Sequence, residues 1–417
     1  MAGISGEHKG SQMKRTIVVG GGQGAGQLVA SLRQEGYDGE IMMIGEEPQL
    51  PYQRPPLSKA YLLGELPVER LLVRPEKFYT DQHIETRLGT KVAAIDTAAQ
   101  TVTLEGGEAL AYSDLVLATG SAVRRLSLPG FDQAGVFYLR TMADVDGIRD
   151  ALTPGKRLVI IGGGYIGLEV AAVSRKLGLE VTVLEMESRI LARVTTPAMS
   201  AFYTQVHTRH GVVIKTEAAA AELLGDGQVT GVRCKDGTEL PADVVIVGVG
   251  ILPRTELAEA AGIACENGIL VDEGTRASAP NVYAIGDCTN HPNPGLGRRL
   301  RLESVPNAMD QARVAAKNIC GGDATYDAVP WFWSDQYDLK LQMVGFSGEA
   351  EEDVLRGDPE SGAFARFYLK DGKLIAVDAV NSPREFMAAR QLVAQKAPVT
   401  AAALANPETD LKTLMSR

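Results

Sequence analysis

Two stretches of this sequence decide its fold: TIVVGGGQGA at residues 16–25 and LVIIGGGYIG at residues 158–167. Each opens with four mostly apolar and mostly β-branched residues, a pattern that favours a buried β-strand. Each then enters a glycine-rich turn, followed by a helical pattern, a second apolar strand and an acid. The repeated layout predicts two βαβ units, each suited to holding a dinucleotide.

The residues of such a turn have separate roles. The first glycine permits the tight bend, the second lets a pyrophosphate approach the backbone, and the third small residue keeps helix and strand close. Phosphate is then bound by the unpaired amides at the helix N-terminus. A single turn of this kind can be a plain strand-helix bend, but two with matching flanks favour nucleotide binding. The candidates are Gly20, Gly22 and Ala25 in the first turn and Gly162, Gly164 and Gly167 in the second.

A carboxylate follows the second strand of each unit. Glu46 stands where it can accept hydrogen bonds from a ribose diol, although it can also be a solvated loop acid beside Glu47. Glu185 occupies the equivalent place after the second turn, where its charge would repel a 2′-phosphate. The sequence therefore predicts NADH over NADPH; Glu187 strengthens that prediction and Arg189 weakens it.

Each glycine turn is paired with a strand later in the sequence. Residues 114–120 and 243–249 each read as a buried strand that ends at small residues, one for each turn. A strand predicted over residues 275–287 ends in Gly286-Asp287. The glycine allows close backbone approach, and Asp287 can accept a hydrogen bond from a polyol such as a flavin ribityl chain. Alone this ending would be structural more often than not; with two turns upstream, the flavin role is favoured.

Composition narrows the function classes. The 417 residues carry a formal net charge of -10, which disfavours nucleic acid as a partner. The cysteines are widely spaced, which argues against a disulfide scaffold or structural zinc, and the first of them is Cys234. An active disulfide beside the first turn is therefore disfavoured. Residues 1–13 lack a signal-like apolar segment and no apolar run is long enough to span a membrane, so we expect a frayed N-terminus and a cytoplasmic protein.

Together these motifs resemble a known family: the FAD-dependent, NADH-linked ferredoxin reductases of the putidaredoxin reductase and rhodocoxin reductase type, among the glutathione-reductase-like flavoproteins. The resemblance spans residue 14 to about residue 390. Besides the two turns and the strand end at 284–287, it rests on PPLSK at 55–59, ATG at 118–120, ESVPNA at 303–308 and WFWSDQY at 331–337.

The resemblance implies an α/β fold of two Rossmann-like domains and a C-terminal α+β domain. We expect an FAD domain over 14–121 and 250–325, an NADH domain over 122–249 and a C-terminal domain over 326–417. The implied activity is hydride transfer from NADH to FAD, then single-electron transfer to a small acidic iron-sulfur ferredoxin. That ferredoxin would feed a cytochrome-type monooxygenase or a ring-hydroxylating dioxygenase.

The resemblance also assigns cofactor residues. Lys59 and Arg140 make physical sense as FAD contacts, since a cation can neutralise the pyrophosphate or hydrogen-bond the flavin. The other FAD residues implied are Gly24, Glu46, Val92, Asp287 and Val305, to which we add Ala118, Thr119, Gly120 and Trp333 from the matched motifs. Those implied for NADH are Gly162, Gly164, Ile166, Gly167, Glu185 and Gly250.

No acid-base catalyst is implied, because the hydride passes between the two cofactors. Tyr165 and Glu169, on the turn that opens the second helix, are expected either to shape nicotinamide access or to pack between domains. The basic stretch at 297–301, with Arg298, Arg299 and the later Arg313, is expected to be either a docking patch for an acidic ferredoxin or an ordinary solvated surface.

Two alternatives stay open at this point. A rubredoxin reductase would share the same turns and differ in its acceptor. An apoptosis-inducing-factor-like flavoprotein would bind the same cofactors but act by interaction.

Overall fold

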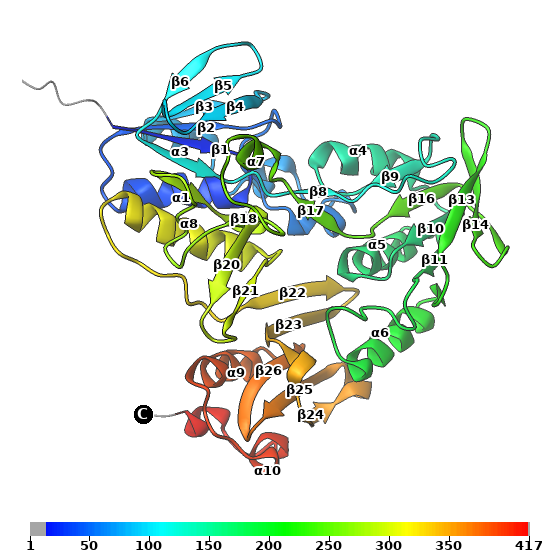
Figure 1. The fold of residues 1–417 in the computed structure, drawn as a ribbon. Coiled ribbons are helices and arrows are strands. Elements are labelled where there is room, and N and C mark those ends of the chain that lie inside the picture. The colour runs from blue at the N-terminus through cyan, green and yellow to red at the C-terminus, as the bar shows by residue number, and fades with distance from the viewer. Residues whose placement is uncertain (1–13, 416–417) are drawn as a thin grey trace, which may run out of the picture. The chain divides into compact units, whose positions relative to one another are not determined.

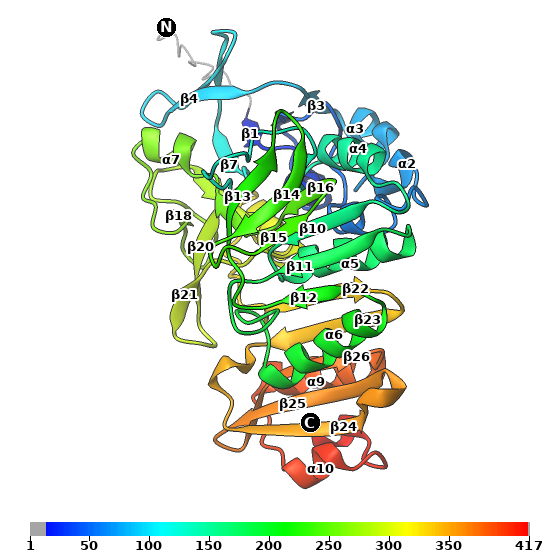
Figure 2. The same ribbon diagram turned by 90° about the vertical axis from the view of Figure 1, so that its right-hand side faces the viewer.

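The computed structural model describes residues 14–415 (Figures 1 and 2), so the expected fraying of residues 1–13 lies outside the described residues. The described chain divides into two compact units, which we treat separately. Unit 1 consists of residues up to 52, 72–120 and 253–327; unit 2 consists of 53–71, 121–252 and residues from 328 onward. The predicted division into three domains stays a prediction.

Unit 1 is built on a parallel five-stranded sheet with the order β19-β7-β1-β2-β3. Successive side chains of a strand point to opposite faces, so Ile17 and Val19 pack on one face and Val18 on the other. The small sheet β4-β5-β6 and helix α7 cover the first face; α1 and α8, side by side in Figure 1, cover the second. The bounds are Arg15–Val19 (β1), Gln23–Gln34 (α1), Glu40–Ile44 (β2), Glu76–Asp81 (α3), Ile84–Arg87 (β3), Val92–Asp96 (β4), Thr101–Leu104 (β5), Ala109–Ala111 (β6), Asp114–Leu117 (β7), Glu256–Ala260 (α7), Ile269–Leu270 (β18), Val282–Ala284 (β19), Thr289–Asn293 (β20), Arg298–Leu300 (β21) and Val305–Ile319 (α8).

Unit 2 repeats this plan in its first part. A parallel sheet with the order β12-β11-β10-β16-β9 carries the sheet β13-β14-β15 on one face, and α5 lies against β10 and β11 (Figure 2). β10 takes the central position that β1 has in unit 1, so the predicted pair of nucleotide-binding folds is confirmed. The bounds are Val68–Leu71 (α2), Ser121–Val123 (β8), Val136–Tyr138 (β9), Met142–Ala151 (α4), Arg157–Ile161 (β10), Tyr165–Lys176 (α5), Glu180–Leu184 (β11), Pro197–Arg209 (α6), Val213–Lys215 (β12), Ala220–Gly225 (β13), Val229–Cys234 (β14), Glu239–Pro241 (β15), Val244–Val247 (β16) and Ile251–Pro253 (β17).

The second part of unit 2 is an antiparallel sheet with the order β22-β23-β26-β25-β24. Helix α9 covers one face, and the other face packs on α5 and α6 through Leu341, Phe364 and Val380. The sequence predicted an α+β region here, which is confirmed. The bounds are Trp331–Gln336 (β22), Leu339–Gly345 (β23), Glu352–Asp358 (β24), Ala363–Lys370 (β25), Lys373–Val380 (β26), Pro383–Gln395 (α9) and Ala401–Ala405 (α10).

The strand predicted over residues 275–287 is wrong in extent. Within this segment only β19 forms a strand, because Thr275 and Asn281 have φ of +64° and +58°, which interrupts a strand. Gly286 then opens a single 3-10 turn, Gly286–Cys288. Among residues 14–415, no helix is long and apolar enough to cross a membrane.

A buried carboxyl group joins the two parts of unit 2. Asp378 on β26 is 5% exposed and accepts hydrogen bonds from Tyr368 Oη at 2.9 Å and Thr195 Oγ1 at 3.0 Å. Burial, the strongest influence, raises the pKa of Asp378 from 3.8 to about 6, although both hydrogen bonds favour the charged form. The folded protein therefore keeps the Asp378 proton up to a higher pH than an exposed aspartate would.

This pKa predicts a loss of stability with rising pH. Because the folded chain holds the Asp378 proton more tightly than the unfolded chain, the free energy of unfolding should fall by up to about 3 kcal/mol as the pH rises from about 4 to 6. Urea unfolding of wild type and Asp378→Asn across this range measures the effect. The variant should lack this fall, and Glu352→Gln, an exposed acid on β24, should keep it. An identical pH profile for wild type and Asp378→Asn would contradict the assignment.

Candidate dinucleotide sites

The first glycine turn joins β1 to α1 in unit 1. Gly20 has a φ of +126°, and a Cβ there would lie 2.1 Å from the Ala118 carbonyl oxygen, so only glycine is accommodated. Gly22 is the N-cap of α1 without a side-chain cap, and a Cβ there would meet nothing within 4 Å. Open space therefore faces uncapped helix amides, which suits a pyrophosphate.

The second turn, between β10 and α5 in unit 2, has the same geometry. Gly162 has a φ of +114°, and a Cβ there would lie 2.3 Å from the Gly248 carbonyl oxygen. Gly164 is an N-cap without a side-chain cap and has open space in front of it. This turn therefore suits a second pyrophosphate equally well.

The two turns differ at the third small-residue position, which is Ala25 in the first turn and Gly167 in the second. A Cβ on Gly167 would lie 2.3 Å from the Gly162 carbonyl oxygen, so α5 sits too close to its turn for any side chain. Ala25, its counterpart in the first turn, is fully buried in the core with its methyl group accommodated. The spacing role expected of this position therefore demands glycine only in the second turn.

The two predicted ribose acids have different surroundings. Glu46 pairs with Arg254 in unit 1, with 2.5 Å between Oε2 and Nη1. Glu185 accepts hydrogen bonds from the backbone N–H groups of Gly163 at 2.8 Å and Glu187 at 2.9 Å, which aim its carboxylate at the second turn. No sequence signal pointed to Arg254, because its partner lies more than two hundred residues away.

Arg189, which weakened the NADH prediction, is held by the fold. Its guanidinium donates to Ser200 Oγ at 2.5 Å and to the Ala192 carbonyl oxygen at 2.9 Å. These bonds tie the cation to the segment before and within α6.

Lys59 and Glu169 form an ion pair inside unit 2. Lys59 Nζ lies 2.6 Å from Glu169 Oε2, and the side chains are 18% and 4% exposed. Ser58 Oγ donates to the same oxygen at 2.5 Å, while Ser334 Oγ donates to Glu169 Oε1 at 2.6 Å. The sequence named Lys59 and Glu169 separately; their pairing follows only from the fold.

Tyr165 packs against the C-terminal strands. Its hydroxyl donates to Met343 Sδ at 2.9 Å, and its ring lies 5.2 Å from that of Phe332. Tyr165 therefore packs within unit 2, and its expected role beside the nicotinamide stays a prediction.

The remaining FAD candidates occupy both units. In unit 1, Thr119 Oγ1 donates to the Arg254 carbonyl oxygen at 2.7 Å, and the side chain of Val92 is buried in the core. In unit 2, Arg140 Nε donates to the Ser121 carbonyl oxygen at 3.2 Å, and Trp333 lies on β22. Unit 1 holds Gly20, Gly22, Gly24, Ala25, Glu46, Val92, Ala118, Thr119, Gly120, Asp287 and Val305; unit 2 holds Lys59, Arg140, Trp333 and all six NADH candidates.

Sequence reasoning missed Gln311 on α8. Its Oε1 accepts from the Gly286 N–H at 2.7 Å and from Thr289 Oγ1 at 3.0 Å, so it fixes the turn that carries Asp287. A glutamine on an amphipathic helix gives no signal of such a contact.

Comparisons with known proteins agree with this geometry. Residues 14–312 match the family model described as pyridine nucleotide-disulphide oxidoreductase, and residues 331–415 match the reductase C-terminal model. The chain belongs to the pyridine nucleotide-disulphide oxidoreductase family. It is 45% identical to a ferredoxin–NAD(P)+ reductase from Sphingomonas sp., covering 96% of this chain and 97% of the relative.

Two more relatives place it within this family. Rhodocoxin reductase from Rhodococcus erythropolis is 42% identical, covering 96% of this chain and 94% of the relative. Putidaredoxin reductase, in its solved covalent complex with putidaredoxin, superposes with a TM-score of 0.93 at 41% identity, covering 96% of this chain and 98% of that one. The resemblance seen in the sequence is thereby confirmed, and family membership implies FAD and NAD(H) as cofactors.

The family name refers to a disulphide, but all four cysteines of this oxidoreductase are free. Cys288, next to Asp287, is completely buried, and burial raises the pKa of its thiol.

The basic residues suggested for docking are partly engaged. Arg299 donates to the carbonyl oxygens of Val271, at 2.6 Å, and Asn290. Arg313 pairs with Asp310 at 2.5 Å. Arg298 is exposed on β21.

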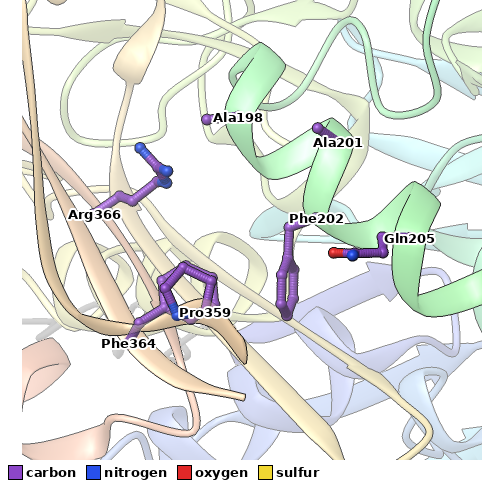
Figure 3. Close-up of a pocket in the computed structure, with 7 residues that line it drawn as sticks. All are labelled: Ala198, Ala201, Phe202, Gln205, Pro359, Phe364 and Arg366. Carbon is purple, nitrogen blue, oxygen red and sulfur yellow. The ribbon is translucent and has the colours of Figure 1, made fainter. Parts of the chain in front are cut away.

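A surface hollow of unit 2 lies apart from the predicted site residues. It opens between α6 and β25, and Figure 3 shows Phe202 and Gln205 on one side and Pro359 and Arg366 on the other. None of the FAD or NADH candidates lines it.

The close packing at Gly167 predicts a selective loss of NADH binding. The methyl group of Gly167→Ala would displace α5 from the second turn, so the Kd for NADH should rise about tenfold or more while FAD stays bound. The dependence of the stopped-flow rate of flavin reduction on NADH concentration measures this Kd. The matched control is Ala25→Gly at the same position of the first turn, which should leave the Kd for NADH unchanged. An unaltered Kd in Gly167→Ala would contradict the role of this contact.

Proposed function

We propose that this protein is an NADH-dependent ferredoxin reductase. It takes hydride from NADH onto FAD and passes single electrons to a small acidic iron-sulfur ferredoxin. The observation that carries the proposal is the pair of geometrically equivalent glycine turns on two copies of one fold, in a chain 45% identical to a ferredoxin–NAD(P)+ reductase over nearly its full length. Flavin chemistry is needed because hydride brings two electrons and an iron-sulfur cluster accepts one.

The first turn is proposed to hold FAD. The N-terminal amides of α1 would bind its pyrophosphate, and Asp287, on the turn anchored by Gln311, would accept a hydrogen bond from the ribityl chain. Glu46 would bind the adenosine ribose beside Arg254, and Lys59 would supply a fixed cation near the flavin. The three-domain division, with FAD residues over 14–121 and 250–325, belongs to this proposal.

The second turn is proposed to hold NADH. The N-terminal amides of α5 would bind the pyrophosphate, and Glu185 would accept hydrogen bonds from the adenosine ribose. The engagement of Arg189 by Ser200 and Ala192 supports NADH over NADPH, because that guanidinium is already bound within the fold. Tyr165 and Glu169 open the same helix and would border the nicotinamide.

The proposed physiological role is electron supply to an oxygenase. Relatives include a ferredoxin–NAD(+) reductase component of an anthranilate 1,2-dioxygenase system and a putidaredoxin reductase solved with putidaredoxin. These names support a ferredoxin acceptor over a rubredoxin, and a reductase over a protein that acts by interaction. Free cysteines fit a reducing compartment, so we place the protein in the cytoplasm.

The visible spectrum tests the proposal directly. Purified protein should show a flavin spectrum that bleaches anaerobically with about one NADH per chain, because two electrons reduce one flavin. A colourless protein that binds no FAD, or a flavin that NADH leaves oxidised, would refute the proposed function.

Coenzyme choice should depend on Glu185. Removing its charge in Glu185→Ser should raise kcat/KM for NADPH about tenfold and lower that for NADH, since like charges no longer oppose the 2′-phosphate. Steady-state rates with both coenzymes measure the change. Glu180→Gln, an exposed acid at the other end of β11, is the control and should keep the wild-type preference. Wild-type preference for NADPH would overturn the assignment.

A further inference from the structure

A line of hydrogen bonds leads from Glu169 into the C-terminal sheet. Ser334 Oγ donates to Glu169 Oε1 at 2.6 Å, and Gln336 Nε2 donates to Ser334 Oγ at 3.1 Å. Gln336 Oε1 lies 2.8 Å from His207 Nε2 on α6, and Tyr337 Oη lies 3.2 Å from His207 Nδ1. We call Ser334, Gln336 and His207 the relay residues.

The chemistry of these groups fixes the direction of every bond. Ser334 has one hydroxyl hydrogen and gives it to Glu169, so it accepts from the Gln336 amide N–H. The amide oxygen then faces His207, which must carry its proton on Nε2 and accept from Tyr337 at Nδ1. Burial lowers the pKa of His207 to about 4, so its ring is neutral at physiological pH. All donors therefore point toward Glu169.

Burying the polar side chains of the relay residues costs solvation free energy, and the need to fill space in the core does not explain why these side chains are polar. Ser334 and His207 are 0% exposed and Gln336 is 1% exposed. Buried polar side chains are tolerated only when hydrogen-bonded, and apolar side chains would fill the same space without that requirement. A fully connected polar network orders the groups that it joins, and here it ends on the carboxylate that holds Lys59.

We propose that Ser334, Gln336 and His207 are positioning residues that hold Glu169, and through it Lys59, in place for hydride transfer. The inference rests on the proposed function, which puts Lys59 beside the flavin. The directed donors stabilise the Glu169 charge and fix its two oxygens, one toward Ser334 and the other toward Lys59 and Ser58. A cation held at a fixed place favours the gain of negative charge nearby, which raises the reduction potential and speeds reduction.

The relay residues position Glu169 and do not conduct protons. A proton passing along the line would force the Gln336 amide into an unfavourable tautomer. The outer end is instead an anchor: the His210 ring stacks on that of Tyr337 with 3.7 Å between centroids and 14° between planes. The end of α6 thereby holds His207 in its ring orientation.

The experiment uses the FAD-loaded protein and the variants Ser334→Ala and His207→Leu. Stopped-flow absorbance at saturating NADH should show flavin reduction about tenfold slower in Ser334→Ala, the cost of losing a hydrogen bond to a charged group, with the Kd for NADH unchanged. His207→Leu should slow flavin reduction by a smaller factor. The double variant, Ser334→Ala with His207→Leu, should reduce its flavin no more slowly than Ser334→Ala alone, because both substitutions act on Glu169 through the same line of hydrogen bonds. The flavin midpoint potential should fall in both variants.

The matched control is Thr195→Val. It also removes a buried hydroxyl group in unit 2, but that hydroxyl donates to Asp378 and not to Glu169. It should leave both the reduction rate and the potential unchanged. His207→Gln keeps a donor for the Gln336 amide oxygen and should restore most of the rate lost in His207→Leu. If His207→Leu does not fold, Tyr337→Phe tests the outer link in its place.

A further readout does not involve flavin reduction. The 15N NMR signals of His207 should report a neutral ring protonated at Nε2 at pH 7. Wild-type rates and potentials in Ser334→Ala, or a His207 ring protonated at Nδ1, would overturn the inference while leaving the proposed function intact. Wild-type protein that binds no FAD would overturn both.

Discussion

Both candidate nucleotide sites depend on the close approach of a glycine backbone to a neighbouring strand end. At Gly20 and Gly162 a Cβ would lie within about 2.3 Å of the carbonyl oxygens of Ala118 and Gly248. Without side chains, the strand can turn directly into a helix whose uncapped amides face open space. The strand end, the turn and the helix N-terminus therefore form one structural motif, which occurs once in each unit.

We propose that the two copies of the fold differ in role because of residues outside the turns. The first unit adds an ion pair between Glu46 and Arg254 and a turn held by Gln311, while the second aims Glu185 at its own turn. The C-terminal sheet contributes Ser334 to the Glu169 environment. We propose that the common scaffold binds the phosphates and that the local carboxylates and cations determine which nucleotide each site takes.

The sequence predicted what depends on local pattern. Apolar β-branched runs and glycine spacing identified β1, β10, both turns and the repeated topology, because each reflects contacts within a few residues or a simple alternation. It could not predict contacts that only the tertiary fold creates, such as the pairing of Lys59 with Glu169 or of Arg254 with Glu46. The prediction of one strand over residues 275–287 was wrong, because an apolar pattern does not reveal the left-handed backbone conformation of Thr275 and Asn281.

The proposed reaction converts two-electron donation by NADH into one-electron delivery to a ferredoxin. The most direct test is the number of ferredoxin molecules reduced for each NADH consumed under anaerobic conditions. The absorbance of the iron-sulfur cluster measures how much ferredoxin is reduced. We expect about two ferredoxins to be reduced per NADH, and none when NADH is omitted. Oxidation of NADH without any reduced ferredoxin would contradict it.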